Sequence, residues 1–183
     1  DIDFNDPIFQ PLYASYPSLA AWIERIKEET LLCFIQEAEG KIQGIAIVSD
    51  EHAVKQADAR HPDKKPISGY YLSDIANDCK KPLRINTFLV ANDCQKQGIG
   101  GQLLERVAAH ASRHGYDSIH ISVRHLDRKE TFQDFLAESG FQRIAYRGEP
   151  GKNDDIWVRK PPFRDMSLAQ KYAVSRRAGH QRL

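Results

Sequence analysis

Apolar residues in the first half of the chain follow two spacings, one typical of strands and one typical of helices. Apolar runs at Leu31–Glu37 and Ile42–Val48 are joined by a short polar turn, and this pattern predicts a β-hairpin. A further apolar run, Leu83–Ala91, predicts another strand. The segment Gly98–His114 predicts an amphipathic helix that stops at Gly115. Its apolar stripe consists of Ile99, Leu103, Leu104, Val107, Ala108 and Ala111.

The second half of the chain begins with an alternating segment, Ser118–Val123, which predicts a strand. Its apolar residues point to one side, and His120 and Ser122 point to the other. A helix is expected over about Lys129–Ser139, before a glycine. The runs Phe141–Arg147 and Asp155–Arg159 then predict a closing hairpin.

The regions around these elements are less regular. Asp6 followed by Pro7 predicts the start of a short helix, and Ser18 is expected to cap a second helix. The stretch Ser49–Lys81 is rich in charged residues and proline, so we expect a long connection there. This connection either helps to define a substrate site or is a solvated insertion without a role.

Length and composition limit the class of protein. A chain of 183 residues with 41% hydrophobic and 28% charged residues suits one globular domain. The net charge of +1 argues against a strongly electrostatic partner, and no apolar run reaches membrane-spanning length. Three widely spaced cysteines lack metal-ligand spacing, so we expect no metal, free thiols and a cytoplasmic location.

The composition changes near the C-terminus, after two consecutive prolines. We therefore expect a domain over residues 1–162 and a basic appendage or linker over residues 163–183. A solvated tail is the simpler interpretation, although a basic tail is also compatible with contact to RNA or an acidic partner.

A glycine-rich loop lies between the strand Leu83–Ala91 and the helix that follows it. Its residues are Gln95, Lys96, Gln97, Gly98, Ile99, Gly100 and Gly101. Backbone N–H groups and the positive end of the helix dipole favour a phosphate group at such a loop. A P-loop is excluded because Gly101 is followed by Gln102, not Lys. A dinucleotide fingerprint is disfavoured because Leu103 occupies its third glycine position.

The pattern Gln95-x-x-Gly98-x-Gly100 resembles the acetyl-coenzyme A loop of the GCN5-related N-acetyltransferase superfamily. Val90 stands where the family has an apolar residue beside the thioester. The segment Phe135–Phe141 looks like the family's F-Y-x-x-x-G-F helix end. The resemblance implies an α/β (α+β) fold with a mixed, mostly antiparallel central sheet flanked by helices on both faces. Only residues 1–4 remain for the first strand of that fold, so we expect it to be incomplete and further domains to be possible partners.

The resemblance also implies a set of site residues. The loop from Gln95 to Gly101 would hold the pyrophosphate of acetyl-coenzyme A, and the backbone of Leu89 and Val90 would bond the pantetheine arm. The family's usual proton donor, a tyrosine, is replaced by Leu136, and Arg84–Val90 contains no carboxylate to act as a base. The remaining candidates for acid–base chemistry are His120, Ser122, His125 and Tyr146.

Two functions stay open on the sequence. The first is an acetyl-coenzyme A-dependent N-acyltransferase whose amine acceptor, a small molecule, a protein or an aminoacyl-tRNA, attacks the thioester directly. The second is a catalytically weak binding or regulatory module of a larger protein, acting on or near RNA. The complete loop favours the first function, whereas Leu136 and the strand without a carboxylate favour the second.

Overall fold

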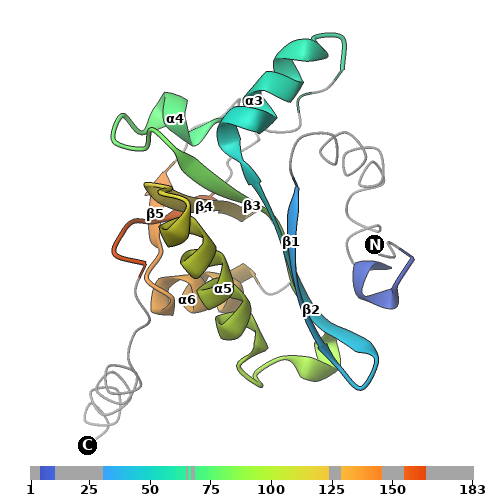
Figure 1. Cartoon of the computed structure of the whole chain (residues 1–183). Helices are drawn as coiled ribbons and strands as arrows, with labels where there is room; N and C mark the ends of the chain where they lie inside the picture. The colour runs from blue at the N-terminus through green and yellow to red at the C-terminus, as the bar shows by residue number, and fades with distance from the viewer. Residues whose placement is uncertain are drawn as a thin grey trace, which may run out of the picture.

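The computed structural model describes residues 5–10, 31–64, 66, 69–123, 129–145 and 155–163, and the structural statements below concern these residues. Within them, six strands form one sheet in the order β1-β2-β3-β4-β6-β5 (Figure 1). The strands are β1 Leu32–Ala38, β2 Lys41–Asp50, β3 Pro82–Val90, β4 Ser118–Val123, β5 Gln142–Ala145 and β6 Asp155–Arg159. The helices are α3 Glu51–Arg60, α4 Leu72–Ile75, α5 Ile99–Arg113 and α6 Lys129–Glu138, with 3-10 turns η1 Pro7–Phe9 and η2 Asn92–Cys94.

The pairing of the sheet is antiparallel except between β3 and β4, which run parallel. Residues of β3 and β4 pair from Pro82 with Ser118 to Ile85 with Ile121. Beyond that point β3 continues to Val90 against β2 alone, whereas β4 stays paired with β6. The two central strands therefore separate in the middle of the sheet, and the predicted mixed, mostly antiparallel fold is confirmed.

A β-bulge lies where β3 leaves β4. Ile47 of β2 pairs with Thr87 and Val48 pairs with Ile85, so Asn86 is the extra residue. Because of this extra residue, Ile85 and Phe88 both face the same core. A bulge increases the local twist of a strand, which is consistent with the departure of β3 from its neighbour here.

Helices cover both faces of the sheet. Helices α5 and α6 lie beside the sheet (Figure 1). The face that they cover holds the main core, which includes Leu103, Val107, Ile119 and Leu136. The opposite face is covered by η1, α3 and the segment around α4, with smaller apolar clusters beneath each.

The prediction of a long connection over Ser49–Lys81 was wrong for much of its length. Asp50 caps α3 by accepting hydrogen bonds from His52 N at 2.8 Å and Ala53 N at 3.2 Å. The helix buries Glu51, Val54 and Ala57. These three residues form a narrow inward stripe on an otherwise polar helix, which explains why its composition resembles that of a loop.

The other predicted elements are found with small shifts at their ends. The expected short helix at Asp6 is η1, which Asp6 caps through Ile8 N at 3.0 Å. The helix expected from Ser18 and the residues from 164 onward lie outside the described residues. Phe163, the first residue of the expected appendage, packs into the main core with 8% of its surface exposed. No helix within the described ranges is long and apolar enough to cross a membrane.

Candidate active site

The glycine-rich loop forms the entrance to α5. Gly98 is its N-cap and has a left-handed backbone with φ of 81°, and Lys96 has φ of 64°. The side chain of Gln95 donates to Asn92 Oδ1 at 3.1 Å and to Val90 O at 3.4 Å, and Gln97 donates to Asp93 O at 3.0 Å. The two glutamines therefore hydrogen-bond within the loop and fix its shape.

The backbone of the loop offers donors to an anion. The amide of Gln102 donates to Gly98 O at 3.1 Å, which is the first turn of α5. The amides of residues 98–101 precede this bond, and in an α-helix such groups have no carbonyl within the helix to donate to. The Ile99 side chain is buried in the core, so only its backbone faces the loop. The N–H groups and the helix dipole together make this a site for a negatively charged group.

Gly100 allows α6 to lie close to the loop. A Cβ atom at this position would lie 3.2 Å from Phe135 Cζ and 3.7 Å from Phe88 Cε1. The rings of Phe88, Phe132 and Phe135 are partly buried, with centroids 5.9 to 6.0 Å apart. This aromatic cluster gives the separated end of β3 an apolar lining on the α5 side.

A tryptophan at Gly101 is the cleanest test of the loop. A Cβ atom there meets nothing within 4 Å, whereas at Gly100 it would press on Phe135. We expect Gly101→Trp to weaken coenzyme A binding more than about tenfold, because the indole would cover the loop amides. The thermal midpoint should change little, since tryptophan has a better helix propensity than glycine by about 0.5 kcal/mol.

Calorimetric titration checks this expectation. Ala109→Trp is the matched control, because it adds the same ring at an exposed position of the same helix, away from the loop. The control should bind coenzyme A as the wild type does. Equal affinity in the Gly101 variant would show that the loop does not hold the ligand.

The separated part of β3 presents main-chain groups on the side that β4 has left. Ala91 N donates to Gln43 O of β2 at 2.9 Å. Because N–H groups alternate along a strand, those of Val90 and Phe88 point away from β2, whereas that of Leu89 points toward it. The open edge therefore carries Val90 and Phe88, whereas Leu89, which the resemblance also implied, pairs with Ile45 of β2.

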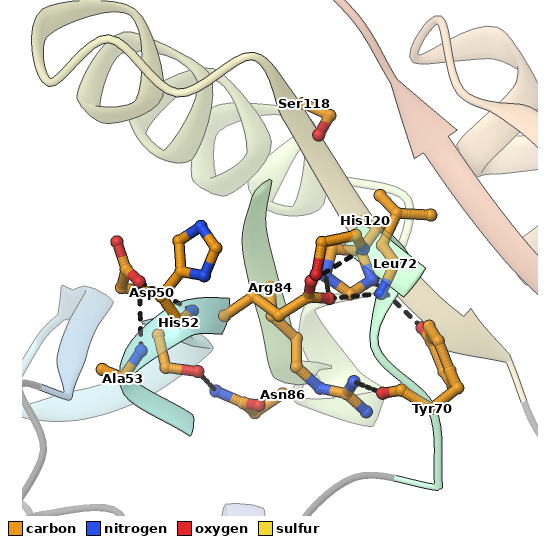
Figure 2. A network of polar contacts seen from close by, with 12 residues as sticks. Asp50, His52, Ala53, Tyr70, Leu72, Arg84, Asn86, Ser118 and His120 are labelled. Carbon is orange, nitrogen blue, oxygen red and sulfur yellow. Dashed lines mark hydrogen bonds and ion pairs between the residues drawn. The ribbon is translucent and has the colours of Figure 1, made fainter. Parts of the chain in front are cut away.

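A second polar group lies on the opposite face, around His120 (Figure 2). His120 Nε2 is 3.0 Å from Glu51 Oε2, and His120 Nδ1 is 3.1 Å from the hydroxyl of Tyr70. Glu51 also accepts from Leu72 N at 2.6 Å and Ser73 N at 2.9 Å. The guanidinium of Arg84 bonds Tyr70 O at 3.3 Å and lies 4.9 Å from the Tyr70 ring centre.

These contacts fix the protonation of the group. Burial raises the pKa of Glu51, but the hydrogen bonds from His120, Ser73 and Leu72 outweigh it and lower the pKa to about 2. Burial lowers the pKa of His120, and the nearby Arg84 adds to this effect while Glu51 opposes it. At neutral pH Glu51 is therefore a carboxylate and His120 is a neutral imidazole.

Of the predicted acid–base candidates, His120 is fully buried and Ser122 is half-buried on β4, and Tyr146 and His125 lie outside the described residues. Glu51 and Tyr70, which contact His120 from elsewhere in the chain, were not predicted. The cap at Asp50 is the one local signal that could have placed Glu51 at the start of a helix. Among the described residues, no group of three or more His, Cys, Asp or Glu side chains comes close enough to hold a metal ion.

In this α+β domain the sheet separates between two parallel strands, beside a glycine-rich loop at the N-terminus of α5. The family model described as the acetyltransferase (GNAT) domain matches residues 61–159, more than half of the chain, so the chain belongs to this family. No sequence among the curated proteins matches the chain.

Solved structures of low sequence identity share the fold. The PaiA N-acetyltransferase of Thermoplasma acidophilum, in complex with coenzyme A, is 14% identical with a TM-score of 0.51, covering 83% of this chain and 75% of its own. FeeM, an N-acyl amino acid synthase from uncultured soil microbes, is 15% identical with a TM-score of 0.57, covering 89% and 88%. The ribosomal-protein-S18-alanine N-acetyltransferase of Escherichia coli is 18% identical with a TM-score of 0.50, covering 77% and 75%.

Proposed function

We propose that the chain transfers an acetyl group from acetyl-coenzyme A to the amine of an acceptor. The observation that carries this proposal is the junction of the loop amides at residues 98–101 with the open edge of β3. A ligand with a diphosphate at one end and an amide-bearing arm at the other matches both features. Family membership supports acyl transfer in general.

The structure suggests a role for each part of the site. The loop amides would hold the diphosphate, with a modest contribution from the exposed Lys96. The open edge of β3 would bond the amides of the pantetheine arm, as a neighbouring strand does. A main-chain N–H fixed at the edge would also stabilise the oxyanion of the attacked thioester, an effect of roughly 3 kcal/mol where such a donor has been removed.

The acceptor is proposed only by its reacting group, an unprotonated amine on a small molecule, a protein or an aminoacyl-tRNA. The near-neutral chain offers no global charge to attract one of these classes over the others. We place the reaction in the cytoplasm, which agrees with the three free cysteines.

A binding or regulatory module remains the competing function because of one position. Leu136, where the resemblance expects a proton-donating tyrosine, has 0% of its surface exposed and belongs to the main core. The side chain there is a packing residue. An enzyme built on this chain must therefore take its acid–base groups from elsewhere.

Calorimetric titration of the full chain with acetyl-coenzyme A and coenzyme A tests the proposal. We expect both to bind with micromolar dissociation constants, which correspond to a binding free energy on the order of −8 kcal/mol. ATP should bind far more weakly because it lacks the pantetheine arm. Release of free thiol in the presence of an amine would then separate an enzyme from a module. Binding without any thiol release would favour the module, and no binding would show that the loop does not hold coenzyme A.

A further inference from the structure

Three ionisable side chains, those of Glu51, His120 and Tyr70, form a linear cluster inside the protein, next to the opening in the sheet. Glu51 of α3 and His120 of β4 have 0% of their surface exposed, and Tyr70 has 5%. Glu51 and Tyr70 contact the two different ring nitrogens of His120 (Figure 2). Tyr70 is thus the most exposed of the three.

The position of His120 places this cluster of three side chains near the proposed site. His120 pairs with Arg84, and the following pair, Ile85 with Ile121, is the last before β3 and β4 separate. One residue along a strand is about 3.3 Å, so His120 lies within a short distance of the opening. Ile119 and Ile121 pack in the main core with α5, so His120 points to the opposite face. The cluster therefore lies beside the opening on the face of the sheet that the loop and α5 do not occupy.

The charge of Glu51 determines which atoms of the cluster donate and which accept. Glu51 is ionised and can only accept, and it accepts hydrogen bonds from Leu72 N and Ser73 N. His120 Nε2 lies 3.0 Å from Glu51 Oε2 without forming a regular hydrogen bond. A neutral imidazole beside a carboxylate is more favourable with its proton on the nitrogen that faces the carboxylate, so Nδ1 is left to accept the Tyr70 hydroxyl proton. A carboxylate that orients a histidine, which in turn accepts a hydroxyl proton, is the arrangement that activates hydroxyl groups in enzymes.

A purely structural clamp would not require this arrangement. Tyr71 already donates to Asp58 Oδ2 at 2.6 Å, and Lys55 pairs with Asp74 at 2.5 Å, so α3 is tied to the same segment by other contacts. Burying a carboxylate and a histidine is unfavourable compared with an apolar core of similar volume. The buried cluster therefore favours a role in catalysis over a purely structural one.

We infer that Tyr70 is a catalytic residue of the acyl transfer, and that His120 and Glu51 are its positioning residues. This inference rests on the proposed function. The acceptor ammonium gives one proton to the Tyr70 oxygen as the Tyr70 proton moves to His120 Nδ1. The amine lone pair then forms the C–N bond and the C–S bond breaks. The second amine proton goes to the coenzyme A thiolate, and the imidazolium returns its proton through Tyr70 to water.

The test compares Tyr70→Phe with Tyr71→Phe in the full chain. Each variant loses one phenolic hydrogen bond from the same segment, but only the first removes the partner of His120. Thiol release from acetyl-coenzyme A is followed with ethylamine as the acceptor, from about pH 5 to about pH 9. A general base contributes at least about 10²-fold, so we expect kcat of Tyr70→Phe to fall about 10²-fold while KM for acetyl-coenzyme A stays within about twofold.

The pH profile distinguishes chemistry from packing. The wild-type rate should rise with pH through the ionisation of His120, whose charged and titratable neighbours are Glu51 on α3, Tyr70, and Arg84 on β3. Tyr70→Phe should lose this inflection, and Tyr71→Phe should keep both the rate and the inflection. A Tyr70 variant that keeps the wild-type inflection overturns the inference, even if its rate or thermal midpoint is lower.

Two further results are decisive if Tyr70→Phe does not fold. Nitrogen-15 NMR of His120 in the wild type should show protonated Nε2 and unprotonated Nδ1, and the opposite tautomer overturns the inference. Coenzyme A titration separates this inference from the proposed function. A wild type that binds coenzyme A but releases no thiol overturns the role of Tyr70 and leaves the loop assignment intact, whereas a wild type that does not bind overturns both.

Discussion

Glu51→Ala is expected to lower the free energy of unfolding by at least about 1–3 kcal/mol, the usual effect of leaving a buried donor without its acceptor. The substitution leaves Leu72 N and Ser73 N without their acceptor and removes the carboxylate beside His120 Nε2. Leu72 N and His120 are buried, where water does not replace a lost contact, and Ser73 N is partly buried. Urea denaturation at neutral pH measures the loss.

The pH dependence of stability provides a second readout of the same contact. The folded-state pKa of Glu51 lies near 2, below its ordinary 4.5, so its contribution is complete above about pH 4.5 and is lost as the pH falls toward 2. His120 has a folded-state pKa below 6.5, so the unfolded chain binds its proton first and stability also falls below about pH 6.5. In Glu51→Ala the fall in the free energy of unfolding below about pH 4.5 should be smaller than in the wild type.

Asp74→Ala is the matched control for Glu51→Ala. Asp74 pairs with Lys55 between the same two elements, but the two side chains are 53% and 43% exposed. An exposed pair contributes at most about 1 kcal/mol, so this variant should unfold almost as the wild type does. Similar losses in the two variants would show that the buried position of Glu51 has no special importance.

Gly44→Val is expected to destabilise the fold by about 1–3 kcal/mol and to weaken coenzyme A binding at the same time. Gly44 lies on β2 opposite Val90, and a Cβ atom there would lie 2.9 Å from both Ile99 Cγ2 and Leu103 Cδ1 and 3.2 Å from Leu89 O. The backbone oxygen has little freedom to move, so the first turn of α5 must shift outward. The loop amides would move with that turn.

Urea denaturation and calorimetric titration measure the two effects of Gly44→Val. Gly69→Val is the control, because a Cβ atom at Gly69 meets nothing within 4 Å. A Gly44 variant with lower stability but unchanged coenzyme A affinity would show that the loop holds its shape independently of the contact between α5 and β2.

Much of the fold follows from periodic patterns that the sequence displays openly. The alternation in β4 and the apolar stripe of α5 predicted those elements within a residue or two. The loop from Gln95 to Gly101 was recognisable because glycines are required where the backbone must be approached closely. The family resemblance is confirmed by the match over residues 61–159.

The features that the sequence did not predict depend on tertiary contacts. Helix α3 looked like a loop because its buried face includes a glutamate, and Glu51 is buried only because His120 and the start of α4 surround it. The bulge at Asn86 and the contact of Gly100 with Phe135 depend on how neighbouring strands and helices meet. No local sequence pattern indicates such tertiary contacts, since the partners are far apart in the chain.

The short parallel seam between β3 and β4 also divides the chain into two consecutive parts. Every other pairing in the described sheet joins strands on the same side of Gly115, β1 to β3 before it and β4 to β6 after it. Within each part the strand pairing therefore joins sequence neighbours, and local contacts of this kind favour rapid folding. The seam is the long-range pairing of the sheet, and β3 and β4 separate where it ends. A ligand lying along the opening would extend the seam and join the two parts of the domain more firmly than the chain does alone.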